Sequence, residues 1–457
     1  MSTVFDALVI GTGQSGPSLA VRLAGAGKRV AIVERNRIGG TCVNNGCIPT
    51  KTLIASARAA WVARNGDEFG VRIGGEIRVD MKAVKARKDR LVAESSTSVE
   101  TWLRGTKGLT LIEGQARFEA PHTVRIGDQT IEAKQIFINV GGRPVVPAVD
   151  GLADTPYFTS SSIMDVDFLP EHLVIVGGSY IGLEFAQMYR RFGSRVTLLE
   201  SGPRLISRDD DDIAQSIKEI LTAEGIDIRT GAGPLKRAAR ENDGIRVEMS
   251  DGTTISGSHL LIAVGRRPNT DDLGLDRAGI ITNKRGYIQV NDELRTNIDD
   301  IWAVGDCNGQ GAFTHTSYND FEIVAANLLD DDRRRLSDRI LTYGLFIDPP
   351  LGRCGMTERE VRASGKKALV ARMAMSRVGR ARERSETQGL MKILVDAASK
   401  RILGAAILGI GGDEVVHVLL DVMYARAPYT LVQRAMHIHP TVAEYLPTAL
   451  GDLRPLD

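Results

Sequence analysis

Residues 5–36 read FDALVIGTGQSGPSLAVRLAGAGKRVAIVERN, in which an apolar run, a glycine-rich turn, a helical stretch and a second apolar run follow one another. Gly11, Gly13 and Gly16 have the spacing G-x-G-x-x-G. The first glycine permits a tight turn, the second admits a pyrophosphate, and the third lets the helix pack on the strand. Glu34 ends the second run, where a carboxylate accepts from ribose hydroxyls. This order predicts a strand-helix-strand unit that binds a dinucleotide.

The same plan returns at residues 172–200, HLVIVGGSYIGLEFAQMYRRFGSRVTLLE. Gly177 and Gly182 stand where the first and third glycines stood, Ser179 replaces the middle one, and Glu200 ends the second strand. The first glycine and the glutamate are 23 residues apart in both units. Ser179 would crowd a pyrophosphate slightly, so an ordinary strand-helix-strand unit stays an alternative. We expect a second dinucleotide site.

Length and charge narrow the classes of function. The chain has 457 residues, too many for one core, and we expect two to four domains. Its 58 basic and 57 acidic residues leave a net charge of +1, which offers no steering field toward nucleic acid or anionic lipid. The first residues show no signal peptide, and no stretch reaches the ~18 apolar residues of a membrane span. We therefore expect a cytoplasmic location and no membrane partner.

Two of the four cysteines lie close together in GGTCVNNGCIPTKT, residues 39–52. Metal ligation by Cys42 and Cys47 would need a second ligand pair, and Cys307 and Cys354 stand alone, so we expect no metal site. A permanent disulfide is also disfavoured, because positions i and i+5 of a regular helix lie roughly 8–9 Å apart, beyond the ~4.4–6.8 Å that a disulfide spans. A labile, redox-active disulfide at a distorted helix start remains, since a helix N-terminus lowers a thiol pKa.

Three stretches join these units to the rest of the chain. Residues 295–309, RTNIDDIWAVGDCNG, hold a strand that ends in Gly305 and Asp306. By itself a Gly-Asp after a strand is usually a turn, but the stretch resembles the second flavin motif of flavoproteins that bind two dinucleotides, which implies that Asp306 accepts from a ribityl hydroxyl. FINVGGRP (137–144) and LIAVGRRP (261–268) are each a buried strand broken by glycine and then proline, and they are similar to the strand-to-domain crossings of flavoproteins that bind two dinucleotides.

A histidine and an acid near the end form a further candidate. HIHPTVAE, residues 437–444, places Glu444 five residues after His439, close enough to orient the imidazole. Pro440 suits the first turn of a helix. Capping of that helix is the structural alternative for the pair.

GGTCVNNGCIPTKT is similar to the active-site stretch of the class I pyridine nucleotide-disulfide oxidoreductases, which include dihydrolipoamide dehydrogenase, mercuric reductase and the reactive-chlorine resistance flavoproteins. The resemblance covers nearly the whole chain. It implies an α/β fold with two Rossmann-like domains, one for FAD and one for NAD(P), and a C-terminal α+β dimerisation domain. It also implies FAD in the first unit, NADH or NADPH in the second, and an obligate homodimer.

The resemblance also assigns roles to single residues. Cys47 resembles the charge-transfer thiol beside the flavin and Cys42 the interchange thiol. Lys51 and Glu184 look like the ion pair next to the flavin, and Tyr180 resembles the aromatic gate over the nicotinamide. Without the resemblance, Lys51 would be interpreted as a solvated lysine, Glu184 as a helix-surface acid and Tyr180 as a core aromatic. His439 and Glu444 look like the acid/base dyad that reaches the partner subunit's disulfide. The remaining expected cofactor contacts are Gly40, Thr41, Gly141, Gly265 and Asp306.

The predicted domains are residues 1–148 and 275–337 for FAD, 149–274 for NAD(P) and 338–457 for dimerisation. Glu200 favours NADH because a carboxylate repels a 2′-phosphate, although Arg204 and Arg208 keep NADPH possible. The charge runs 208–212 and 330–335 are expected to be solvated loops or helix starts.

The predicted activity passes electrons from NAD(P)H through FAD and the Cys42–Cys47 disulfide to a small-molecule or protein disulfide, or in reverse from a dithiol. A metal-ion or oxidant reductase and a redox-sensing flavoprotein are the alternatives. Within the family that the chain resembles, true mercuric reductases carry an extra cysteine pair near the C-terminus and lack the His-Glu dyad. This chain has no cysteine after position 354 and has His439 and Glu444, so the resemblance does not favour dedicated mercury reduction.

Overall fold

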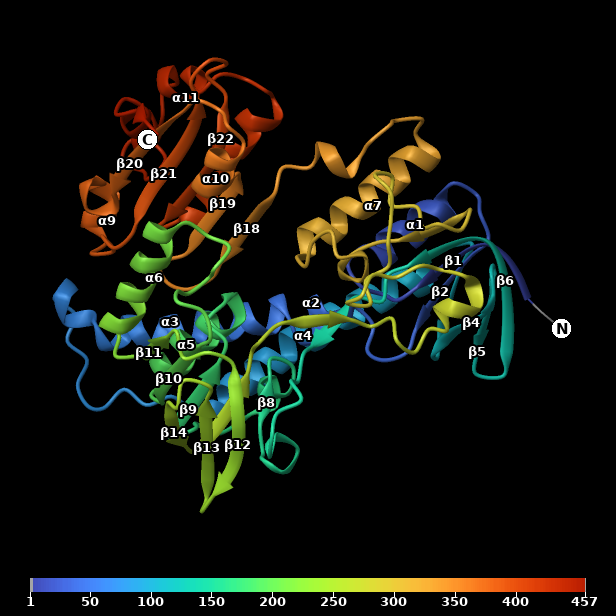
Figure 1. Ribbon diagram of the computed structural model, residues 1–457, viewed down its shortest axis with the longest axis horizontal. Helices are drawn as coiled ribbons and strands as arrows, with labels where there is room; N and C mark the ends of the chain where they lie inside the picture. The colour runs from blue at the N-terminus through green and yellow to red at the C-terminus, as the bar shows by residue number, and fades with distance from the viewer. Residues whose placement is uncertain (1–2, 457) are drawn as a thin grey trace.

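The computed structural model describes residues 3–456, which form three lobes, each built on its own β-sheet. The N-terminal and central lobes have mostly parallel sheets, and the C-terminal lobe has an antiparallel one (Figure 1). This arrangement confirms the predicted fold class of two Rossmann-like domains followed by a smaller α+β domain.

The sheet of the N-terminal lobe follows from the first strand-helix-strand unit. Its order is β3-β2-β1-β6-β5-β4, and β17, which comes after the central lobe in sequence, pairs with β6. The central strands are parallel and almost wholly buried on both faces, which explains their continuous apolar runs. The strands are β1 (Thr3–Ile10), β2 (Val30–Glu34), β3 (Leu109–Glu113), β4 (Ala116–Ala120), β5 (Thr123–Ile126), β6 (Gln129–Ile138) and β17 (Ile301–Ala303).

The central lobe repeats this topology. Its sheet has the order β11-β10-β9-β15-β8, so that β10-β9-β15 corresponds to β2-β1-β6 of the N-terminal lobe. A three-stranded meander covers one side, and a two-stranded ribbon of β7 and β16 forms the crossing between the two lobes. The strands are β7 (Gly142–Pro144), β8 (Phe158–Thr159), β9 (His172–Val176), β10 (Arg195–Glu200), β11 (Asp227–Thr230), β12 (Leu235–Glu241), β13 (Gly244–Met249), β14 (Thr254–Gly257), β15 (His259–Ile262) and β16 (Arg266–Pro268).

The C-terminal lobe packs helices against a sheet of order β18-β19-β22-β21-β20-β23. Its strands are β18 (Thr342–Leu345), β19 (Leu351–Gly355), β20 (Ala368–Ala374), β21 (Leu390–Asp396), β22 (Ile402–Leu408) and β23 (Arg454–Pro455). Its helices are α8 (Glu358–Ala363), α9 (Gly379–Glu383), α10 (Gly412–Tyr424), α11 (Thr430–Arg434) and α12 (Tyr445–Leu450).

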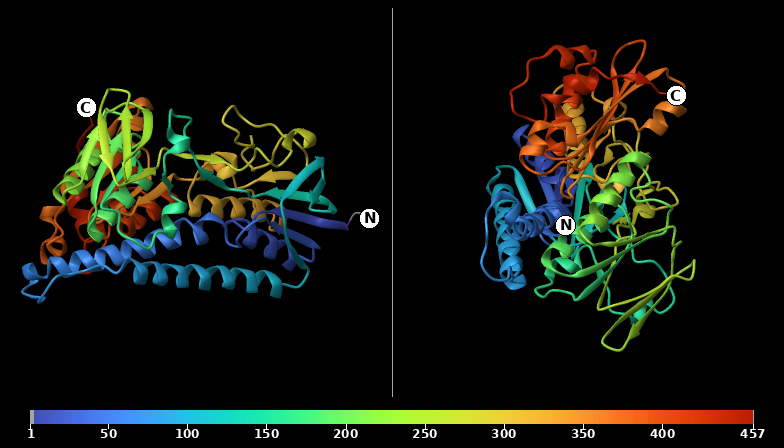
Figure 2. Two further views of the ribbon diagram at one scale, coloured as in Figure 1. Left: turned by 90° about the horizontal axis from the view of Figure 1, so that it is seen from below. Right: turned by 90° about the vertical axis from the view of Figure 1, so that its left-hand side faces the viewer.

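Two long helices carry the cysteine segment from the first lobe to the second. They are α3 (Cys47–Arg64) and α4 (Met81–Gly105), which lie side by side along one edge of the molecule (Figure 2, left). The other helices are α1 (Gly16–Gly25), α2 (Gly40–Asn44), α5 (Tyr180–Phe192), α6 (Asp211–Ala223) and α7 (Thr314–Leu329). Among residues 3–456, no helix has the length and apolarity needed to span a membrane.

One charge run behaves differently from the expectation. Residues 208–212 do supply the start of α6, but Asp209 and Asp210 are buried rather than solvated. The reason is that Arg353 of β19 reaches both carboxylates from the C-terminal lobe. A run of acids in a sequence gives no sign of cations that arrive from strands more than a hundred residues away.

The close approach at Gly182 provides a test of the fold. A Cβ on Gly182 would meet the carbonyl of Gly177, which the turn before α5 cannot move freely. We expect Gly182→Ala to cost about 1–3 kcal/mol through overpacking. Gly25→Ala, at the exposed end of α1 with open space around it, is the control and should be neutral or slightly stabilising. Thermal unfolding of both variants measures this, and equal stabilities would contradict it.

Candidate active site

The first glycine turn is held by its own glutamate. Glu34, at the end of β2, accepts hydrogen bonds from the backbone N–H of Thr12 at 2.9 Å and from its hydroxyl at 2.7 Å. A Cβ on Gly13 would lie 2.8 Å from Oδ1 of Asn139, and one on Gly16 would meet the carbonyl of Gly11. The turn therefore exposes bare backbone at the N-terminus of α1, which is the chemistry that a pyrophosphate requires.

The second glycine turn is built in the same way. Glu200 accepts from the backbone N–H of Gly178 at 2.6 Å and of Gly202 at 2.7 Å. Gly177 has a φ of +117°, which demands glycine. Ser179 has a φ of −104°, which any residue adopts, so serine at this position introduces no backbone strain. The turn again leads into a helix N-terminus, that of α5.

Asn139 ties the first turn to the segment that follows β17 and leads to Asp306. Its Oδ1 accepts from the N–H of Gly16 at 3.1 Å, and its Nδ2 donates to the carbonyl of Val304 at 3.0 Å. No sequence motif pointed to Asn139, since an asparagine after a strand is also an ordinary turn residue. Asp306 lies two residues after Val304. Burial raises its pKa, although the charge of Arg266, 3.9 Å away, acts to lower it.

A pocket of about 230 Å³ opens beside Asp306, at the crossing between the N-terminal and central lobes. Arginines from three separate segments line it: Arg208, Arg266, Arg267 and Arg285. Gly141 and Gly265, which begin the two crossing strands, have φ values of +62° and +128°. The cluster is suited to anionic groups such as phosphates, and no sequence motif pointed to Arg285 as a member of it.

Cys42 and Cys47 lie on either side of a break between two helices. Cys42 is in α2, which begins at Gly40 and Thr41, and Cys47 is the first residue of α3. The break confirms the expected distortion, because no regular helix joins the two positions. Both cysteines are thiols in this structure. Cys47 is exposed and Cys42 is half-buried.

The surroundings of the pair favour a thiolate at Cys47. A hydrogen bond from the Cys42 thiol, the hydroxyl of Thr314 and the charge of Lys51 together lower the pKa of Cys47 to about 6, although burial opposes them. The same hydrogen bond and burial raise the pKa of Cys42. Thr314 Oγ1 lies 3.2 Å from the sulfur of Cys47, at the start of α7. The arrangement therefore separates a thiolate from a thiol within one pair.

Lys51 and Glu184 meet as expected and have a third partner. The Lys51 ammonium lies 3.0 and 2.9 Å from the two oxygens of the largely buried Glu184 carboxylate. The backbone N–H of Phe346 donates to the same carboxylate at 3.1 Å, and its ring lies 4.4 Å from the ammonium. Phe346 comes from the segment after β18, and nothing in its sequence context pointed to it.

Tyr180 begins α5 and packs into a cluster of aromatic rings. Its ring centroid lies 5.4 Å from that of Tyr343 and 6.1 Å from that of Phe313, both edge to face. Burial raises the pKa of Tyr180 to about 12, so its hydroxyl stays protonated. Phe313 directly precedes Thr314, which places this cluster next to the sulfur of Cys47.

His439 and Glu444 also form the expected pair, but in a different setting. The Nδ1 atom of His439 lies 3.0 and 3.1 Å from the Glu444 oxygens, and its side chain is 79% exposed. The prediction that Pro440 begins a helix was wrong: it follows a cis peptide bond in a loop, and α12 begins only at Tyr445. Within residues 3–456, no hydrogen bond or ion pair joins this pair to Cys42 or Cys47.

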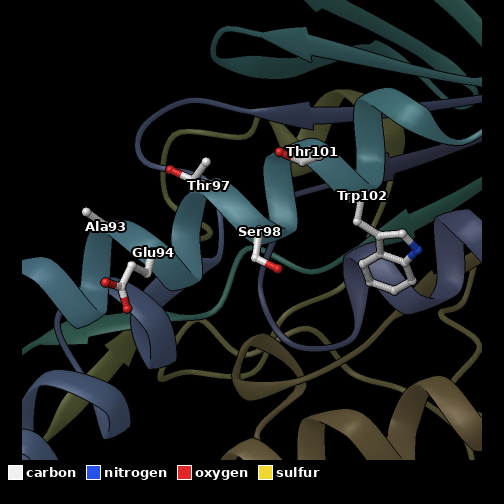
Figure 3. A pocket seen from close by; sticks show the side chains of 6 residues that line it. All are labelled: Ala93, Glu94, Thr97, Ser98, Thr101 and Trp102. Carbon is white, nitrogen blue, oxygen red and sulfur yellow. The ribbon is translucent and has the colours of Figure 1, made fainter.

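A larger hollow of about 720 Å³ lies elsewhere, along the outer face of α4 (Figure 3). Six side chains of this one helix line it: Ala93, Glu94, Thr97, Ser98, Thr101 and Trp102. It contains none of the candidate residues. Over residues 3–456, no three His, Cys, Asp or Glu side chains are grouped to hold a metal ion.

Comparison with protein families decides the class of the molecule. Residues 5–320 match the family model described as pyridine nucleotide-disulphide oxidoreductase, and residues 342–450 match its dimerisation domain. The chain belongs to the pyridine nucleotide-disulphide oxidoreductase family. Members of this family are FAD- and NAD(P)-dependent enzymes, so the chain is an oxidoreductase of this class.

Three relatives within the family carry different names. The chain is 37% identical over 450 residues to the probable pyridine nucleotide-disulfide oxidoreductase RclA of Escherichia coli, covering 97% of this chain and 98% of that one. It is 34% identical to a mercuric reductase of Streptomyces lividans, with 98% and 96% of the two chains covered. It is 33% identical to a dihydrolipoyl dehydrogenase of Haloferax volcanii, with 97% and 95% covered.

A solved structure agrees with the fold. The Cu(II) complex of the HOCl-induced flavoprotein disulfide reductase RclA from Escherichia coli matches with a TM-score of 0.90 and 36% identity. The match covers 98% of this chain and 99% of that one.

The lowered pKa of Cys47 can be tested by a pH titration of its thiolate. In the reduced enzyme the Cys47 thiolate should be present above about pH 6 and lost below it, while Cys307 and Cys354, whose pKa values burial raises to about 12, stay silent. Thr314→Ala removes a donor and should raise the midpoint, whereas Thr314→Ser keeps the hydroxyl and should not.

Ultraviolet thiolate absorbance against pH measures the midpoint. A transition near pH 6 that persists in Cys47→Ser, or equal midpoints in the two Thr314 variants, would contradict the assignment.

Proposed function

We propose that this enzyme uses NAD(P)H to reduce a disulfide formed by Cys42 and Cys47, and that the resulting dithiol then reduces an external disulfide. The reverse direction would use the same groups. The observation that carries the proposal is the asymmetric sulfur pair. One member lies beside Thr314 and has a pKa that the charge of Lys51 helps to lower, and the same chain holds two glycine turns that each suit a dinucleotide.

The two turns are proposed to hold different dinucleotides. FAD suits the first, because Gly11, Gly13 and Gly16 leave the backbone open and Asp306 lies at the end of the neighbouring strand. NAD(P)H suits the second, with Tyr180 at its rim. Bound FAD would supply the electron relay, since it accepts a hydride equivalent from NAD(P)H and returns an electron pair to a disulfide.

The protein's own groups balance the reaction. NAD(P)H, one proton and the disulfide give NAD(P)⁺ and two thiols. Cys42, the protonated member, then attacks the external disulfide after losing its proton, and Cys47 closes the internal bond while two external thiols leave. Lys51 stabilises the Cys47 thiolate by its charge throughout.

His439 is proposed as the proton carrier for that exchange. Glu444 holds Nδ1, which leaves Nε2 free at an exposed position. Because no contact joins it to the cysteines of its own chain in the described residues, it would serve the disulfide of a partner subunit. The dimerisation domain supports this assignment, and an obligate homodimer is part of the proposal.

Reduction of Cu(II) is a second candidate. It is favoured by the solved RclA structure, which is a Cu(II) complex, and by the soft, accessible sulfur pair in this chain. Two Cu(II) ions would take one electron each from the dithiol, which returns to the disulfide.

We further propose that the domain boundaries lie near residues 148, 274 and 337, so that the NAD(P) domain is inserted between two FAD segments.

An acceptor panel distinguishes these functions. The purified holoenzyme is assayed for NADH oxidation with lipoamide, small disulfides, Cu(II) and Hg(II), and a disulfide reductase turns over the disulfides most rapidly. Cys47→Ser should abolish this turnover. It should also abolish the long-wavelength absorption band of the reduced enzyme, which arises from charge transfer between the Cys47 thiolate and the flavin. Cys354→Ala, at a buried cysteine outside the site, should retain both. Turnover with Cu(II) alone would support the second candidate. A colourless purified protein would refute both functions, because both require bound flavin.

The choice of coenzyme has its own test. Glu200 ends β10, where a 2′-phosphate would meet its negative charge, so NADH is the proposed donor. We expect the kcat/KM for NADH to exceed that for NADPH by at least roughly tenfold. Glu200→Gln should narrow this ratio, mainly through a lower KM for NADPH. A preference for NADPH in the native enzyme would contradict the assignment.

A further inference from the structure

A buried cluster of charges joins the central lobe to the C-terminal lobe. Arg353 of β19 is 1% exposed and lies 2.8 Å from Asp209 and 3.2 Å from Asp210. Lys392 of β21, also buried, lies 3.3 Å from Asp210 and 2.5 Å from Glu358. Removing either side of such a cluster would leave an uncompensated buried charge, so the two lobes are fixed to each other here.

Tyr343 connects this cluster to the aromatic rings of the site. It lies in β18, almost fully buried, and its hydroxyl donates to Oδ2 of Asp209 at 3.1 Å. The other oxygen of Asp209 is held by Arg353. A phenol that donates to a carboxylate already fixed by a guanidinium has one preferred ring position.

The ring of Tyr343 in turn supports Tyr180. It stacks on Phe313 with centroids 5.8 Å apart and planes at 11°, and it meets the ring of Tyr180 at 5.4 Å and 76°. Contacts of this kind depend steeply on ring orientation. A shift of Tyr343 would therefore pass to Tyr180.

We propose that Tyr343, anchored by Asp209, is a positioning residue that sets Tyr180 over the nicotinamide and so supports hydride transfer from NAD(P)H. The inference rests on the proposed function, in which Tyr180 is the gate of the second dinucleotide site. It assigns the buried Asp209–Arg353 pair a role in the NAD(P)H half of the reaction and none in the thiol half.

The test is Tyr343→Phe, which keeps the ring and removes only the donor. Reduction of the bound flavin by NADH, followed by stopped flow, should slow about fivefold, and the dissociation constant for NAD⁺ measured by calorimetry should rise by a similar factor. Reduction by dithiothreitol, which enters through the cysteine pair, should change less than twofold. Tyr189→Phe, another buried tyrosine with only a long 3.5 Å bond to Ile163, is the matched control and should change none of these.

A double-mutant cycle separates positioning from simple loss of structure. If Tyr343 acts through Tyr180, the effect of Tyr343→Phe disappears when Tyr180 is already alanine. Equal slowing in both backgrounds, or equal slowing of the NADH and dithiothreitol reactions, would overturn the inference. Failure of NADH to reduce the flavin of the native enzyme would instead refute the proposed function.

Discussion

The ion pair of Lys51 and Glu184 joins the helix that carries Cys47 to the helix that begins the second dinucleotide turn. Glu184 is largely buried, so its charge has to be matched inside the protein, and it accepts from both the Lys51 ammonium and the Phe346 backbone. Three segments from three lobes therefore meet at one carboxylate. This contact fixes the helix that carries Cys47 relative to the helix that follows the second glycine turn, on which the proposed electron path depends.

The two glycine turns show how a repeated unit can be specialised. In both, the glutamate at the end of the second strand accepts from the backbone of the turn, so it shapes the turn before any ribose arrives. A carboxylate has capacity for further donors, and the two roles are compatible. The two turns differ in their surroundings. Asp306 and the helices that carry Cys42 and Cys47 adjoin the first turn, and the aromatic cluster of Tyr180 adjoins the second.

Local patterns allowed the fold and much of the site to be predicted from the sequence. The glycine spacings predicted both turns, and the resemblance of the cysteine segment predicted that Lys51 would meet Glu184. Two of the misses share a physical cause, since each depends on a partner distant in sequence. Asp209 and Asp210 are buried because Arg353 reaches them, and Phe346 joins the site through its backbone, which no side-chain pattern reveals. Pro440 was misplaced because proline suits both a helix start and a loop.

The central claim is that Cys42 and Cys47 form an electron store in series with the flavin. Anaerobic titration of the holoenzyme with dithionite measures this store directly. The account predicts uptake of about four electrons per subunit, two by the flavin and two by the disulfide, and about two in Cys42→Ser. Uptake of about two electrons by the native enzyme, unchanged in the variant, would contradict it.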